Sequence, residues 1–423
     1  MTDTNTKITA GLPKGWQFTT IGEITEKFLN GGTPPTKNPE YWQGNIPWTT
    51  SSPITSFYLD RGECTISKEG LEKSASNLIP KNNVLISTRV GVGKVSVNRI
   101  DVAINQDLTG LILDKTKITP EFFVWTLLSK EYNQKLKGMS RGTTIKGLIR
   151  SELERFALPL PPLSEQRQIA TILSTVDDAI QRSQQAIAET ERLKAGVMEE
   201  LMTKGIGHTK FKEDPDVRRV PTGWDIKQLG DVCTVKTGPF GAQLHMSDYV
   251  EKGTPIITVE HLGDLGVIHE NLPLVSDADK SRLSDYVLNE GDIVFSRVGS
   301  VDRSCYISKK ESGWLFSGRL LRVRPATNEL LPTYLNAYFS FEGFKHRIRS
   351  ASVGGTMANL NTSIMNQIKI IFPPLPEQQK IASILSTIDR KITLQRQRTA
   401  HYEQLKQGLM NDLLTGKRRV KVT

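Results

Sequence analysis

The chain has 423 residues, 37% hydrophobic and 24% charged, which is typical of a globular protein of two to three domains. Its formal net charge of +10 favours a polyanionic partner, nucleic acid first and a membrane surface second. Three cysteines without a CxxC pair argue against a disulfide framework or a cysteine zinc site, and no stretch is apolar enough for a signal peptide or a membrane span. We therefore expect a cytoplasmic protein with no membrane partner.

The first part of the chain mixes strand and helix patterns. "NVLISTRVGVGKVSV", from Asn83 to Val97, predicts a strand, a glycine turn and a second strand. "TPEFFVWTLLSKEYNQKLKGM", from Thr119 to Met139, predicts helix. Residues 1–160 are therefore expected to form one α/β (mixed α+β) domain.

A proline-rich stop and a long helix follow this domain, and the chain then repeats them. "PPLSEQRQIATILSTVDDAI" begins at Pro161, and "PPLPEQQKIASILSTIDRKI" begins at Pro373, with 13 of 20 positions identical. Both segments predict helices, over 165–204 and 377–415, with apolar residues at heptad spacing. The predicted interface between the two helices consists of Ile169, Leu173, Val176, Ile180, Ile381, Leu385, Ile388 and Ile392. An antiparallel coiled coil would bury these stripes, and two core helices of one globular domain are the alternative.

The repeat extends beyond the helices. "LPKGWQFTTIGEI" at Leu12 pairs with "VPTGWDIKQLGDV" at Val220, and "LISTRVG" at Leu85 pairs with "IVFSRVG" at Ile293. We expect a pseudo-two-fold internal repeat of two similar domains, separated by two long antiparallel coiled-coil helices. The predicted boundaries are 1–160 for the first domain, 161–204 for the first helix, 205–219 for a linker, 220–372 for the second domain, 373–416 for the second helix and 417–423 for a basic tail.

Candidate nucleic-acid contacts follow from residue type and from expected loop positions. Arg89 and Arg297 both follow a predicted strand and precede a glycine turn, where a guanidinium can bind phosphate or read guanine; a shared structural ion pair is the alternative. Other cations and amides in loops supply charge and base-edge donors or acceptors, although for any single one of them a solvated surface position is favoured. The predicted DNA-binding residues are Lys37, Arg89, Lys94, Asn105, Gln106 and Arg141 in the first domain, and Lys236, Gln243, His245, Arg297, Arg303 and Arg319 in the second.

Motifs for catalysis are missing from the sequence. "RVGVGKVS" departs from a P-loop at Thr88 and Val95, and "NPEY" at Asn38 departs from the NPPY loop of amino-methyltransferases. No HExxH metal spacing or GxSxG nucleophile elbow occurs. We therefore predict no catalytic residues, no metal site and no cofactor bound by this chain, and we expect a recognition subunit.

Together, the duplicated "PPLxEQxxIAxILSTxD", the repeated "LPxGW", "TPPTKNPEYWQGNIPW" and "KTGPFGAQLHMSDYV" resemble the specificity (S) subunits of type I restriction–modification enzymes, from Leu12 to Val420. By this resemblance, the two domains would be target-recognition domains and the helices would be the spacer between them. Each domain would read one half of a bipartite double-stranded DNA site, and the helices would set the gap.

The resemblance also implies partners. Two modification (M) subunits would use S-adenosylmethionine to methylate adenine N6, and restriction (R) subunits would cleave DNA with ATP and Mg²⁺. The M subunits would dock on the spacer helices. The chain itself would be a noncatalytic specificity subunit of a prokaryotic cytoplasm. A protein-only scaffold with two α/β binding domains, or a stand-alone DNA-modifying enzyme, is the alternative.

Overall fold

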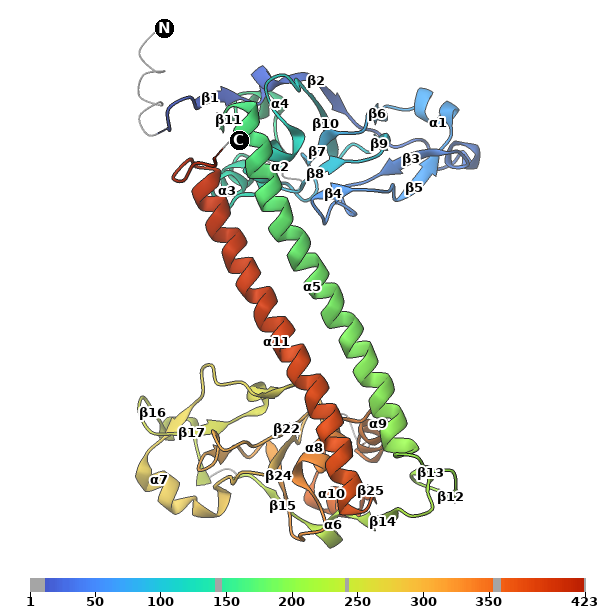
Figure 1. Ribbon diagram of the computed structural model, residues 1–423, viewed down its shortest axis with the longest axis vertical. Coiled ribbons are helices and arrows are strands. Elements are labelled where there is room, and N and C mark those ends of the chain that lie inside the picture. Colours follow the sequence, from blue (N-terminus) through green and yellow to red (C-terminus); the bar gives the residue numbers. More distant parts are fainter. Residues whose placement is uncertain (1–11, 141–146, 240–242, 353–358, 422–423) are drawn as a thin grey trace. The chain divides into compact units, whose positions relative to one another are not determined.

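The computed structural model describes residues 12–140, 147–239, 243–352 and 359–421 (Figure 1). The chain divides into two compact units. The first unit comprises residues 1–182 and 398–423, and the second comprises residues 183–397. Each unit therefore contains one half of helix α5 (Leu163–Thr203) and one half of helix α11 (Leu375–Leu413).

The first unit holds a mixed α/β domain built on two larger sheets. The five-stranded sheet has the order β2 (Thr25–Asn30), β10 (Leu108–Leu113), β7 (Asn83–Ser87), β8 (Val95–Asn98) and β4 (Tyr58–Leu59). The four-stranded sheet has the order β5 (Cys64–Ile66), β3 (Ile46–Thr49), β9 (Val102–Ile104) and β6 (Asn77–Ile79). β1 (Gln17–Thr20) pairs with β11 (Ala157–Leu160), and the helices are α1 (Lys68–Glu72), α2 (Pro120–Leu128), α3 (Lys130–Gly138) and α4 (Arg150–Glu154).

Helix α2 is the core helix of this domain. The Thr119 side chain accepts a hydrogen bond from the backbone N–H of Phe122 and so caps the helix, and Pro120 occupies the first turn, where no N–H is needed. The aromatic side chains of Phe122, Phe123 and Trp125 are almost completely buried. The helix predicted from Thr119 to Met139 thus exists as two helices, α2 and α3, with Ser129 between them.

The second unit repeats this plan. Its main sheet has the order β15 (Cys233–Thr237), β24 (Leu320–Pro325), β21 (Ile293–Ser296) and β22 (Ser304–Tyr306). A second sheet has the order β16 (Tyr249–Val250), β20 (Leu274–Val275), β17 (Thr254–Ile257) and β23 (Leu315–Phe316). Three two-stranded pairs are β14 (Asp225–Gln228) with β25 (Lys369–Phe372), β12 (Phe211–Asp214) with β13 (Arg218–Pro221), and β18 (Leu262–Gly263) with β19 (Gly266–Val267). The helices are α6 (Leu229–Val232), α7 (Asp277–Arg282), α8 (Pro332–Ser340), α9 (Glu342–Ala351) and α10 (Thr362–Gln367).

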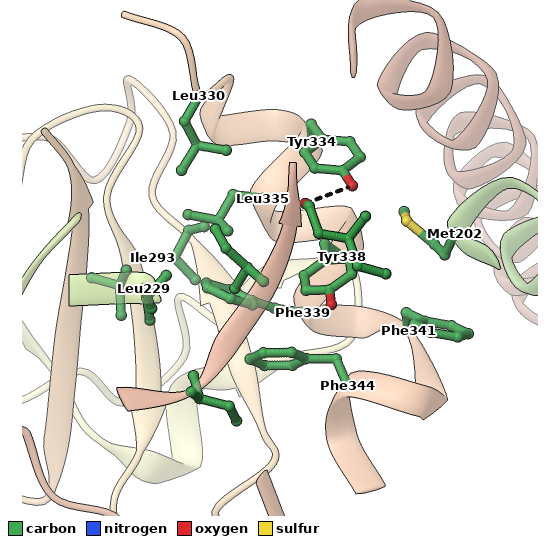
Figure 2. Packing of buried hydrophobic residues seen from close by; sticks show 14 of the residues in the cluster. Met202, Leu229, Ile293, Leu330, Tyr334, Leu335, Tyr338, Phe339, Phe341 and Phe344 are labelled. Atoms are coloured by element: carbon green, nitrogen blue, oxygen red, sulfur yellow. Dashed lines mark hydrogen bonds between the residues drawn. The ribbon is translucent and has the colours of Figure 1, made fainter. Parts of the chain in front are cut away.

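An aromatic core holds α8 and α9 against the sheet and the end of α5. Figure 2 shows Tyr334, Tyr338 and Phe344 packed together, with Met202 of α5 beside them. The Tyr334 hydroxyl donates a hydrogen bond of 3.2 Å to the carbonyl of Ile371, so its buried polar group is satisfied.

The strand pairings confirm the internal repeat. In each domain an entry strand pairs antiparallel with the strand that precedes the long helix, as β1 with β11 and β14 with β25. The order β2-β10-β7-β8 recurs as β15-β24-β21-β22, and the parallel pair β3–β9 recurs as β17–β23. The two sequences therefore encode one fold twice, although their loops differ.

The long helices run antiparallel within each unit. In the first unit Lys406 Nζ lies 2.6 Å from the Asp177 carboxylate, and in the second Lys194 Nζ lies 2.6 Å from the Asp389 carboxylate. The repeat relates these two ion pairs, because Asp177 corresponds to Asp389 and Lys194 to Lys406. Charged pairs at such seams fix which residues face each other, so they specify the register.

The apolar stripes of the helices pack on two surfaces at once. Six of the eight predicted interface residues are buried, and the other two, Val176 and Ile388, are half-buried. Ile169 and Leu173 belong to the core of the first domain, together with Met410 and Leu413 of α11. The stripe thus joins its own domain to the other helix. Among the described residues, no helix is long and apolar enough to cross a membrane.

Candidate nucleic-acid interface

The turn between β7 and β8 presents Arg89 to solvent. Gly91 and Gly93 adopt φ angles of 75° and 98°, which a residue with a side chain rarely adopts, so the turn depends on them. The backbone N–H of Arg89 donates to the carbonyl of Asp107 at 3.3 Å, which ties the turn to the loop between β9 and β10. Arg89 itself is exposed, and within the described ranges its guanidinium has no hydrogen bond or ion pair. A free guanidinium held on a fixed turn can bind phosphate or guanine.

A cavity of about 340 Å³ with a mixed polar and apolar lining lies beside this arginine. Arg89, Arg150 and Gln106 contribute to its lining. The Arg150 guanidinium lies 5.0 Å from the Phe28 ring centre, and its Nε donates to Glu154 at 2.8 Å. The Gln106 side-chain oxygen accepts from the Thr33 hydroxyl at 2.6 Å, so its amide nitrogen is left to donate. These groups together offer donors suited to an anion or to a base edge.

The other predicted DNA contacts of the first domain differ in their surroundings, and two of them are bonded to neighbouring residues of the domain. Lys94 donates to the carbonyl of Ser51 at 2.9 Å and so holds the neighbouring loop. Asn105 is buried, and both ends of its amide bind Asp107. Lys37 is exposed, and Arg141 lies outside the described residues.

In the second domain the equivalent arginine is engaged. Arg297 is half-buried, and its Nη1 lies 3.5 Å from the carbonyl of Gly318. Its backbone N–H donates to the carbonyl of Arg319 at 2.9 Å, just as Arg89 binds the loop of its own domain. The Arg319 side chain is exposed, without a partner in the described part of the chain. Arg319, in the adjoining loop between β23 and β24, therefore offers the exposed guanidinium here rather than Arg297.

The remaining predicted contacts of the second domain are spread along its loops. Lys236 lies 2.9 Å from Asp285, and its hydrogen bond and charge lower the pKa of that carboxyl below its ordinary value. Arg303 donates to the carbonyl of Leu262. Gln243 accepts from the Tyr286 hydroxyl at 3.0 Å, and His245 is exposed. Lys236, Gln243 and Arg303 thus have structural partners as well as surface positions.

Sequence reasoning missed the residues that fix each domain on its helix. The indole N–H of Trp16 donates to Glu165 at 2.9 Å, and that of Trp224 donates to Glu377 at 2.8 Å. These are the tryptophan of each "GW" and the glutamate of each "EQ", so their repetition was the available signal. A second side chain also contacts each glutamate, since Arg419 binds Glu165 and His208 Nε2 lies 2.9 Å from Glu377.

The glutamine of each "EQ" is also an anchor. Gln166 accepts from the backbone N–H of Thr119 at 2.8 Å and donates to the carbonyls of Lys117 and Pro161. Gln378 makes the three matching bonds in the second domain, with Leu331, Glu329 and Pro373. Both glutamines are completely buried. Within the described ranges, no three His, Cys, Asp or Glu side chains gather as a metal site would require.

Comparisons with known proteins agree on one family. The family described as "Type I restriction modification DNA specificity domain" matches twice, at residues 13–192 and 221–404. The type I restriction enzyme MjaIX specificity subunit of Methanocaldococcus jannaschii is 27% identical, over 97% of this chain and 95% of its own length. The EcoKI specificity subunit of Escherichia coli is 21% identical, over 88% of this chain and 81% of its own.

Solved structures share the fold. The type I S subunit from M. genitalium superposes with a TM-score of 0.62 at 16% identity, covering 96% of this chain and 97% of its own. A chain from a study of complex assembly and conformational transition in a type I restriction–modification system superposes with a TM-score of 0.58 at 19% identity, covering 96% and 99%. The architecture predicted from the repeat is thus confirmed.

Proposed function

Because the chain belongs to the family of type I restriction–modification DNA specificity subunits, we propose that it is the noncatalytic subunit that reads a bipartite DNA site. The observation that carries this proposal is the contrast between the two turns. One framework places a loop arginine at the same point of both domains, but the free guanidinium belongs to Arg89 in one and to Arg319 in the other. Equal frameworks with different exposed donors suit the reading of two different half-sites.

The proposal assigns the chemistry to partners. Two modification subunits would supply S-adenosylmethionine-dependent methylation of adenine N6, and restriction subunits would supply ATP- and Mg²⁺-dependent cleavage. The complex would act in a prokaryotic cytoplasm, where the DNA lies. The spacer helices would carry the modification subunits and set the gap between the half-sites. The uninterrupted 41 residues of α5 support such a role, because a continuous helix holds a fixed rise per residue.

Mapping methylated adenines in host DNA by single-molecule sequencing, with and without the gene for this chain, tests the proposal. We expect one bipartite sequence to be methylated only when the gene is present. Exchange of residues 12–160 for those of another family member should change one half-site and leave the other intact. Methylation that does not depend on the gene would contradict the proposed function.

The role of the helices needs a separate experiment. Four residues inserted after Ser183 and four after its repeat equivalent, Gln395, would add about one turn to both helices. We expect a longer gap between unchanged half-sites. Altered half-sites with an unchanged gap would contradict the spacer role without contradicting DNA recognition.

Strongly salt-dependent DNA binding by the chain with its modification subunits would distinguish recognition from a protein-only scaffold, because phosphate contacts release counterions. Methylation or cleavage by the isolated chain would instead support a stand-alone enzyme.

A further inference from the structure

The second unit contains a cavity of about 460 Å³ where its domain meets the two helices. The starting half of α11, the end of α5 and helix α8 line it, together with residues 263–267 and His269. Met198, Ala382 and Leu385 give it an apolar wall. A cavity of this size lies within the range of small-molecule sites.

The first unit has a tryptophan at the corresponding point. Trp125 of α2 is 1% exposed, and its ring stacks on Phe57 with 4.3 Å between the ring centres. The indole N–H donates to the Ser174 hydroxyl at 3.2 Å, and Lys406 Nζ lies 4.9 Å from the centre of the ring. The hollow that remains beside Trp125 has a volume of only about 160 Å³.

The second unit keeps two polar neighbours of that indole but lacks the indole itself. Ala337 of α8 stands at the place of Trp125, and Ser386 and Lys194 stand at the places of Ser174 and Lys406. All three line the cavity. The Ser386 hydroxyl donates to the carbonyl of Ser383 at 3.0 Å, which leaves its lone pairs free to accept a hydrogen bond.

Two pairs of charged groups stand in the wall, Glu311 with His269 and Lys194 with Asp389. Glu311 is 4% exposed and accepts from His269 at 2.6 Å and from the backbone N–H of Ser308 at 2.9 Å. Lys194 lies 2.6 Å from Asp389, as Lys406 does from Asp177. An incoming ring would therefore meet a lysine held near its face, an acceptor for an N–H group and an apolar wall.

We propose that this cavity binds a planar aromatic ring with an N–H donor, supplied from outside the chain. Trp125 shows a group that the repeated serine and lysine accommodate, and Ala337 leaves the space for it. The ring could be a tryptophan side chain of a modification subunit or a free heteroaromatic molecule, since both present the same chemistry.

The test uses the full-length chain and 5-fluoroindole, observed by ¹⁹F NMR. We expect broadening and a shift of the fluorine signal with the wild-type chain, and loss of binding with Ala337→Trp, which fills the cavity. Ala337→Ser is the matched control and should bind as the wild type does. No binding by the wild-type chain at millimolar probe, or undiminished binding by a folded Ala337→Trp variant, would overturn the proposal.

A second pair of variants does not depend on the folding of Ala337→Trp. Ser386→Ala removes the acceptor and should weaken 5-fluoroindole binding about fivefold to tenfold, the value of one hydrogen bond. The same change should leave 5-fluoro-1-methylindole, which has no N–H, unaffected. Ser174→Ala, the equivalent change in the first repeat, should leave both probes unaffected. Equal effects of Ser386→Ala and Ser174→Ala would contradict the assignment.

Repeating the titration with the assembled complex identifies the source of the ring. Loss of 5-fluoroindole binding upon addition of the modification subunits assigns the ring to a partner side chain. Retained binding, still abolished by Ala337→Trp, assigns the cavity to a free ligand.

Discussion

The two domains join their helices through the same hydrogen bonds but through different packing. Gln166 and Gln378 make three matching bonds each, and Trp16 and Trp224 donate to matching glutamates. Beside these bonds, however, Trp125 fills one junction, while Ala337 leaves the other open.

Hydrogen bonds are directional and costly to leave unmade, whereas apolar contact is not directional. The polar anchors therefore tolerate little variation between the copies. Apolar filling can vary, provided that stability remains sufficient. The comparison thus separates residues that define geometry from residues that contribute only stability or binding.

The largest effect on stability is expected when the tryptophan that fills the junction of the first unit is removed. Trp125→Ala deletes a side chain that is 1% exposed, so the first unit should lose about 3–5 kcal/mol of unfolding free energy. Calorimetry, with proteolysis to identify the affected unit, measures the loss. The variant should also bind two molecules of 5-fluoroindole instead of one. A folded variant with a single site would show that the two junctions are not equivalent.

The glutamine anchors come next. Gln166→Leu and Gln378→Leu each remove three hydrogen bonds to the backbone, one of them fully buried, and each should destabilise its own unit by about 2–3 kcal/mol. Chemical denaturation monitored by domain-specific proteolysis measures both. Gln185→Leu, on the exposed surface of α5, is the control and should cost less than about 0.5 kcal/mol. If the two variants lose clearly different amounts of unfolding free energy, the two glutamines do not have equivalent roles.

How far the sequence predicts this structure depends on the kind of residue. The repeat and the heptad stripes predicted two equal domains and two helices, because periodic burial leaves a visible pattern. The same pattern could not show that Ile169 and Leu173 pack on their own domain as well, since a stripe records burial but not the surface that covers it.

Polar contacts were harder to predict. Asn105 and Lys94 have the right chemistry for DNA, yet Asn105 binds Asp107 and Lys94 holds the loop at Ser51. Their partners lie in other turns, and loop conformation leaves no periodic signal. The anchors in "GW" and "EQ" were visible as repeated letters, but repetition alone does not distinguish a hydrogen-bond partner from a helix cap.

A smaller effect is expected at the ion pairs between the helices. Lys194→Asp places two carboxylates together where 21% and 36% of the side-chain surfaces are exposed, so we expect a loss of about 1–2 kcal/mol. Adding Asp389→Lys reverses the ion pair and should restore most of the lost stability. Lys406→Asp with Asp177→Lys should behave in the same way in the first unit. A double variant no more stable than the single one would show that the pairs do not fix the register.

The smallest effect on stability, and the sharpest contrast between the domains, concerns Arg89 and Arg297. Arg89 has no partner among the described residues, so Arg89→Ala should change stability by less than about 0.5 kcal/mol. Arg297 contacts the carbonyl of Gly318 from a half-buried position, so Arg297→Ala should destabilise the second unit. Arg89→Ala should weaken DNA binding by the assembled complex more than Arg297→Ala does.

Replacement by lysine separates the two uses of a guanidinium at Arg89. A phosphate contact needs only charge, so Arg89→Lys would keep the affinity, and only Arg89→Ala would lower the salt dependence, by about 0.9 in the slope of log K against log salt. A contact to guanine needs the planar fork, so Arg89→Lys would instead relax the methylated sequence at one base pair. Unchanged affinity, salt slope and sequence in both variants would remove Arg89 from the interface, and Arg150 in the adjoining cavity would then be the cation to replace.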